Sequence, residues 1–227
     1  MQYVLFAGAV GVVFFTCAQL MTRNKQPIHY CMVLGCLCAS YVVLYLWARE
    51  VGVLRRLPAL AGTDAAATFL ATPAFFLASL SVLYEGRKPV RSYAVFFIAP
   101  GALALATVVY DVLAASFFPR ASDAAPFSSP ARMALSLTAN LAFLGAVCAD
   151  LLAALRLHRA GLVRHRAGFR HQVVFLFLYL ACALTMFVRF VLRDELPYEI
   201  AIAALCVVMI AFGLTRIAVS YFVAQEP

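Results

Sequence analysis

Four charged side chains lie inside otherwise apolar segments of this 227-residue chain: Asp111, Asp150, Arg189 and Arg216. A charge in a lipid-crossing helix is costly, and it usually faces the interior of a helix bundle, where opposite charges pair. On the topology derived below, Asp111 and Arg189 lie near the outer ends of their spans, whereas Asp150 and Arg216 lie near the inner ends. We therefore expect two ion pairs at two depths, an outer pair of Asp111 with Arg189 and an inner pair of Asp150 with Arg216.

The outer pair is the candidate ligand-binding site. Four polar or aromatic residues are expected beside it: Tyr110, Asn140, Tyr198 and Glu199. Such a group could bind a small polar ligand that enters from outside. The alternative is that both pairs only hold helices together, or that Arg189 and Arg216 extend toward lipid headgroups. The sequence leaves both interpretations open.

The other residues that could do chemistry argue against an enzyme. The four histidines all fall in expected loops: His29, His158, His165 and His171. No span therefore offers haem or zinc ligands. Both lysines, Lys25 and Lys88, also fall in loops, which excludes a retinal Schiff base in the bundle. The seven cysteines lie in or beside apolar runs, as small hydrophobic residues do. No HExxH, GxSxG, GxGxxG or P-loop motif occurs. We expect no catalytic residue, no metal and no cofactor.

Composition indicates that transmembrane helices position these residues. Hydrophobic residues make up 65% of the chain and charged residues 12%, and the mean hydropathy is +0.94. A soluble fold could not bury so much apolar surface, whereas about 20 apolar residues cross one membrane. The apolar runs predict an all-α, seven-helix membrane bundle that forms one domain, 1–227. The expected spans are 3–21, 31–48, 64–84, 93–116, 133–155, 172–192 and 199–220.

Two of these spans contain an internal proline, and one contains closely spaced glycines. The third span is diluted by Ala, Thr and Ser and contains Pro73, and the fourth contains Pro100. Kinks are expected at both prolines, since neighbouring helices can satisfy the freed carbonyl groups. Gly8 and Gly11 in the first span predict a close approach to another helix.

The distribution of basic residues predicts the orientation. The first, third and fifth loops together hold ten Lys and Arg against one acid, whereas the other three hold six basic residues and six acids. The positive-inside rule then places the N-terminus outside and the C-terminus in the cytoplasm. The first apolar run lacks a preceding basic segment, so we expect a retained span. The basic fifth loop is expected to attract anionic lipids, with no direct binding of nucleic acid.

The region 52–106 carries a family resemblance. Its pattern consists of Gly52, Arg55, Arg56, Pro58, Pro73, Lys88, Arg91, Phe97 and Pro100. It resembles the seven-span N-terminal sensor module of membrane-bound AraC-type transcription regulators from spirochaetes and Bacteroidetes. It is also similar to the seven-span module of some bacterial histidine kinases. The chain departs from the pattern at Ala71-Thr72-Pro73, where the family tends to have Gly-Pro.

The resemblance implies a sensor in the bacterial inner membrane. Such a module receives an external or membrane signal, for example an unknown small ligand, and its last span passes that signal to a cytoplasmic output domain or partner protein. The partner can also be a second copy of the chain, in a homodimer. Two other functions stay open, a small-solute transporter or channel and a structural membrane subunit. The lack of an evident inverted repeat and the few polar residues along any helix face argue against a transporter.

Overall fold

The computed structural model describes residues 6–8, 10–13, 27–57, 60, 62–84, 94–117, 130–163, 166–194 and 196–223. Within these ranges the side chains of 27–29, 55, 114–117, 166–168, 209 and 212–223 are not described. Every regular element in the described part of the chain is helical.

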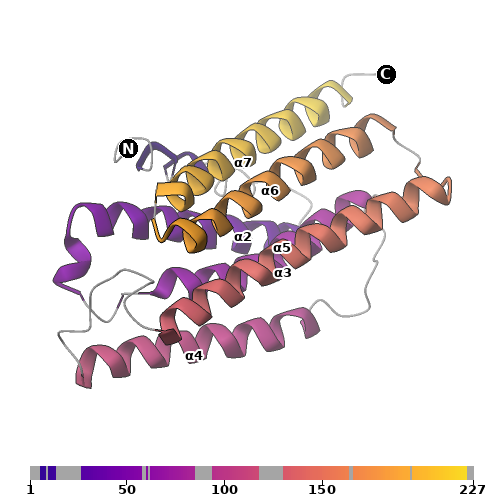
Figure 1. Cartoon of the computed structure of the whole chain (residues 1–227). Helices are drawn as coiled ribbons and strands as arrows, with labels where there is room; N and C mark the ends of the chain where they lie inside the picture. The colour runs from indigo at the N-terminus through magenta and orange to yellow at the C-terminus, as the bar shows by residue number, and fades with distance from the viewer. Residues whose placement is uncertain are drawn as a thin grey trace.

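The long helices run beside one another as a bundle (Figure 1). In chain order they are α2 (Pro27–Glu50), α3 (Thr63–Leu83), α4 (Val95–Phe117), α5 (Pro130–Arg159), α6 (Arg166–Leu192) and α7 (Leu196–Val223), with a short 3-10 helix η1 (Val53–Arg55) after α2. The predicted all-α class is thereby confirmed. Each of α2 to α7 overlaps one of the segments that the sequence predicts as spans.

Five of these helices, α2 to α6, contain stretches that are long and apolar enough to cross a membrane. In α7 the described apolar stretch, Leu196–Val208, is shorter. Large apolar side chains cover the outside of the bundle, including Val191 at 82% exposure and Ile98 at 70%. Lipid tails solvate such a surface, and α-helices satisfy their own backbone polar groups. These features indicate a helical membrane protein.

Helix α3 lies at the centre of the bundle, in contact with α2, α4, α5 and α6. In its apolar stretch 67% of the residues are buried, against 17% in α4, which lies at one edge (Figure 1). A helix that is surrounded by helices needs small side chains so that backbones can approach closely. This explains why the third segment is rich in Ala, Thr and Ser. The helices α3 and α4 each continue through their internal proline, Pro73 and Pro100.

The N-terminal helical residues 6–8 and 10–13 pack against α2 and α7. The ring of Phe6 lies 5.8 Å from that of Trp47, measured between centroids. A Cβ atom added at Gly11 would lie only 2.7 Å from Cδ1 of Ile210. The small residues of this segment therefore do allow a close approach, and the partner is α7.

Candidate functional site

Each of the helices α2 to α7 places one charged side chain in a common group at one end of the bundle. This six-charge cluster consists of Arg49, Asp64, Asp111, Arg132, Arg189 and Glu199. It lies at the end where the connections α2–α3, α4–α5 and α6–α7 join the helices. It contains three arginines and three acids, and a further acid, Glu50 at the end of α2, also interacts with Glu199.

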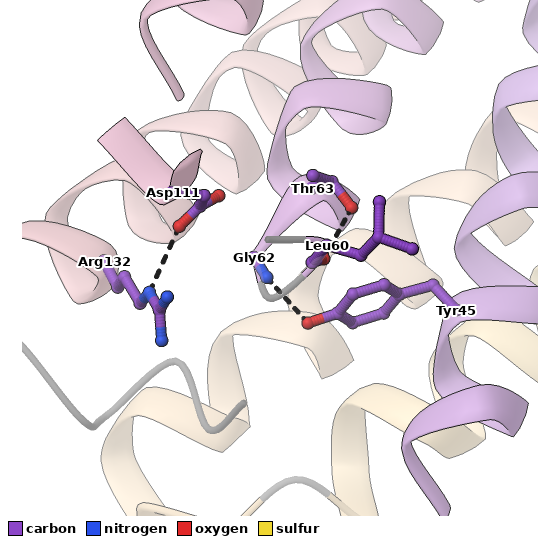
Figure 2. A network of polar contacts seen from close by, with 6 residues as sticks. All are labelled: Tyr45, Leu60, Gly62, Thr63, Asp111 and Arg132. Atoms are coloured by element: carbon purple, nitrogen blue, oxygen red, sulfur yellow. Dashed lines mark hydrogen bonds and ion pairs between the residues drawn. The ribbon is translucent and has the colours of Figure 1, made fainter. Parts of the chain in front are cut away.

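The ion pair between Asp111 and Arg132 is the more deeply buried of the two ion pairs in the cluster. Nε of Arg132 donates to Oδ1 of Asp111 at 3.2 Å, and the side chains are only 7% and 1% exposed (Figure 2). We expected Asp111 to pair with Arg189. The ion pair that forms is with Arg132, in the first turn of α5, since α4 and α5 both pack against α3.

A second ion pair joins α2 to α7. Nη2 of Arg49 donates to Oε1 of Glu199 at 2.6 Å, and the side chains are 16% and 11% exposed. Arg49 lies in the last turn of α2, and Glu199 lies in the first turn of α7. Each charge therefore also interacts favourably with its own helix dipole. Arg132 lies at a helix N-terminus, where a cation is disfavoured, so its placement depends more strongly on Asp111.

Arg189 connects α5, α6 and α7. It is only 1% exposed, and its Nη2 donates to Oγ of Ser136, one turn along α5 from Arg132. Its guanidinium carbon lies 3.8 Å from the ring centroid of Tyr198, which is a cation–π geometry. Arg189 is also the cation that acts most strongly on Asp64, in the first turn of α3.

Gly62 brings the start of α3 into contact with the cluster. Its φ of 88° lies in the left-handed region, and its N–H donates to the Tyr45 hydroxyl at 2.8 Å (Figure 2). A Cβ atom at this position would lie 2.8 Å from one carboxylate oxygen of Asp111 and 3.0 Å from the other. The hydroxyl of Thr63 donates to the Leu60 carbonyl at 2.7 Å and fixes the same turn. Only glycine suits both the backbone angle and the space.

A small cavity lies inside the cluster. Its lining residues are Tyr45, Arg49, Gly62, Asp64, Ala65, Thr107, Asp111, Arg132, Leu135 and Ser136. The space open to the centres of water-sized molecules is about 20 Å³, which holds about one water molecule. The space is therefore small in this structure, and a ligand larger than a water molecule would have to displace side chains.

The residues predicted for the outer site fall in three groups. Asp111 lines the cavity, while Arg189, Tyr198 and Glu199 contact other members of the cluster. Tyr110 is half-buried and is not among the residues that line this cavity. Asn140 is 2% exposed and lies two turns of α5 beyond Arg132.

Three charged members of the cluster were not predicted as site residues from the sequence: Arg49, Asp64 and Arg132. Each lies in the first or last turn of its helix, just beyond the apolar run. The sequence did contain a signal for them, since opposite charges stand at the ends of these helices. In a bundle whose consecutive helices run in opposite directions, those ends lie on the same side.

The inner pair of Asp150 with Arg216 cannot be placed in the same way, since the side chain of Arg216 lies outside the described residues. Asp150 itself is 3% exposed and interacts with the side chain of Ser79 on α3. Among the described residues no three His, Cys, Asp or Glu side chains form a group that could hold a metal ion.

No protein-family model, no curated protein and no solved structure matches the chain. Its function has therefore to be inferred from the six-charge cluster and its surroundings.

Proposed function

We propose that the chain is an integral membrane sensor module of seven spans. Its N-terminus faces the outside, and its C-terminus passes the signal to a cytoplasmic output domain or partner protein at the bacterial inner membrane. The observation that carries this proposal is the six-charge cluster, to which each of α2 to α7 contributes one side chain at a single end of the bundle.

A cluster of this kind can act as a switch. A ligand that carries a carboxylate or a cationic group can replace one partner of an ion pair, and the displaced side chain then changes the contacts of its helix. One ion pair joins α4 to α5, and the other joins α2 to α7. Replacing one partner of a pair therefore changes a constraint between two helices, which in the second pair lie far apart in the sequence. Repacking of interfacial ion pairs is an established route to rigid-body helix movement.

The charge balance of the loops supports the orientation. The connections next to the cluster, together with the helix ends that they join, hold six basic and six acidic residues, whereas those at the opposite end hold ten basic residues and one acid. By the positive-inside rule the cluster then faces outside and the opposite end faces the cytoplasm. An external ligand would reach the cluster without crossing the membrane.

An apolar layer beyond the cluster favours a sensor over a channel or transporter. A cavity in the middle of the bundle is lined by Ala39, Val42, Thr68, Ala71, Phe75, Phe143, Met186, Tyr198, Ile202, Leu205 and Cys206. Nearly all of these side chains are apolar, and apolar constrictions stop water and ions by dewetting. Among the described residues, this layer therefore offers a polar solute little to replace its hydration.

The experiment tests coupling between the two ends of the bundle. Hydrogen–deuterium exchange is measured on the full chain in lipid nanodiscs, with and without the substitution Asp111→Asn. We expect faster exchange not only at the cluster but also in residues 156–163, at the far end of α5. The control is Thr138→Val, since Thr138 is exposed to lipid and bonds only to its own helix at the Ala134 carbonyl.

If Asp111→Asn changes hydrogen–deuterium exchange only at the cluster, the sensor proposal is contradicted. The cluster would then only hold the helices together. A parallel assay tests transport in liposomes, with sodium, chloride and small carboxylates as the solutes. Flux of any of them that depends on the chain would favour a transporter instead.

A further inference from the structure

A second polar group lies deep in the bundle, away from the six-charge cluster. This inner triad consists of Ser79 on α3, Asp150 on α5 and Gln172 on α6, whose exposures are 8%, 3% and 3%. Nε2 of Gln172 donates to Oγ of Ser79 at 2.9 Å, and the Ser79 side chain also interacts with the Asp150 carboxyl. Three helices thus meet at three buried polar side chains.

The inner triad and the six-charge cluster lie at different depths. Fifteen residues separate Asp64 from Ser79 along α3, which corresponds to about 22 Å of helix. The hydrocarbon core of a membrane is about 30 Å thick, so the inner triad lies near the opposite membrane surface. Ser79 is only four residues from the end of α3, so an ion that enters from that membrane surface has a short path to the inner triad.

Two oxygen atoms of the inner triad lack a donor. Oδ1 of Asp150 and Oε1 of Gln172 are buried, and neither has a hydrogen-bond partner among the described residues. Both belong to side chains that interact with Ser79. A buried carboxylate without a counter-charge is expensive in a medium of low dielectric constant.

Asp150 and Ser79 also line a cavity. The space open to the centres of water-sized molecules is about 20 Å³, and Thr72 and Tyr179 also line it. The described residues that line this cavity include no Arg, Lys or His, and Asp150 is their only carboxyl group. The cavity therefore combines one carboxyl group, a few hydroxyl-bearing side chains in a mostly apolar wall, and room for one small particle.

We propose that the inner triad binds a sodium ion. Hard cations take oxygen ligands, and the cavity wall offers the carboxylate of Asp150 and the hydroxyl of Ser79, which Gln172 holds in place from α6. A single carboxylate balances a single positive charge, whereas a divalent ion would leave a net charge buried in the bundle. Sodium is smaller than a water molecule and fits the cavity, while potassium is about as large as one. This site is independent of the proposed function of the six-charge cluster.

The test compares thermal unfolding of the full chain in nanodiscs of neutral lipid, in sodium chloride and in choline chloride of equal ionic strength. We expect sodium to raise Tm by at least about 3 °C, in a saturable manner. Potassium should raise Tm much less. Binding of radioactive sodium to the same sample should saturate at about one ion per chain.

Substitutions identify the site. Asp150→Asn should abolish both the Tm response and the binding of radioactive sodium. Ser79→Ala keeps the charge and should raise the sodium concentration at half-saturation about tenfold, the effect of losing one ligand worth about 1.4 kcal/mol. The matched control is Asp194→Asn, because Asp194 is an exposed carboxylate that bonds to the backbone N–H of Leu196. It should respond to sodium as the unmodified chain does.

Three results would overturn the proposal: an equal Tm in sodium and choline, an equal response to sodium and potassium, or a sodium response that survives Asp150→Asn. An equal Tm in sodium and choline has a further use when Asp150→Asn and Arg216→Gln are measured singly and together. If their losses of Tm are then non-additive, Arg216 is the counter-charge of Asp150 instead of sodium.

Discussion

Replacing Asp111 with Asn should destabilise the bundle by about 3 kcal/mol. At an effective dielectric constant of about 20, two unit charges 3.2 Å apart attract by about 5 kcal/mol, part of which offsets their desolvation. Removing one partner of a buried ion pair typically costs about 3–5 kcal/mol. The lower end applies here, because Asn keeps one acceptor for Arg132 and the adjacent cavity can admit about one water molecule.

The assay is reversible unfolding in lipid bicelles, from which the free energy of unfolding is obtained. Asp111→Asn and Arg132→Gln are measured singly and together. The double variant buries no uncompensated charge, so it should be more stable than the sum of the single losses predicts, by about 2 kcal/mol. Thr138→Val, on the lipid-facing side of α5, should change the free energy by less than about 0.5 kcal/mol.

Additive losses would refute this reasoning, since they would mean that the two side chains do not stabilise one another. A loss below about 0.5 kcal/mol for Asp111→Asn would refute it as well, because the carboxylate would then be neutral or solvated and not the buried partner of Arg132.

Three other substitutions test separate parts of the cluster through Tm in the same bicelles. Gly62→Ala should lower stability by more than about 1 kcal/mol, because it strains the backbone and its Cβ would clash with the carboxylate of Asp111. Gly101→Ala has open space around its Cβ and should be neutral or stabilising. Equal effects of the two substitutions would contradict the close approach of Gly62 to Asp111. Arg189→Lys keeps the charge but loses the planar group above an aromatic ring, so a loss of about 1 kcal/mol is expected, and an unchanged Tm would show that this stacking contributes nothing. Glu199→Gln should cost less than Asp111→Asn, since its pair with Arg49 is more exposed, and the reverse order would argue against burial as the cause.

The helices could be predicted from the sequence because lipid imposes one simple condition on them. A segment that crosses must be apolar for about 20 residues, and stretches of that length mark α2 to α6, while the described apolar stretch of α7 is shorter. Even the diluted third segment follows from this condition together with packing, since Ala and Ser replace larger residues where α3 is surrounded by helices. The internal prolines could be located, but a bend at Pro73 or Pro100 stays a prediction.

The pairing of charges could be predicted only in part. The sequence indicates that Asp111 is buried and needs a cation, but depth alone does not distinguish Arg189 from Arg132. The choice depends on the lateral position of α5 beside α4, which no apolar pattern encodes. Arg132 also lies beyond the apolar run and so has the appearance of a loop residue, although the first helical turn buries it to 7% exposure.

The inner triad was accessible to sequence reasoning only through Asp150. Ser79 and Gln172 are neutral, and nothing in their local sequence marks them as neighbours of a carboxylate. Their meeting requires the ends of α3, α5 and α6 to converge, which is a property of the assembled bundle.

A sensor requires the six-charge cluster and the basic connection between α5 and α6 to face opposite sides of the membrane. Single cysteines at Asp194, beside the cluster, and at Leu162, in the basic connection, can be labelled in intact bacterial cells with a membrane-impermeant maleimide. The unmodified chain is the background, and permeabilised cells show the total reactivity. The proposed orientation predicts that Asp194→Cys is labelled in intact cells and Leu162→Cys only after permeabilisation. Labelling of Leu162→Cys in intact cells, or of both positions, would contradict it.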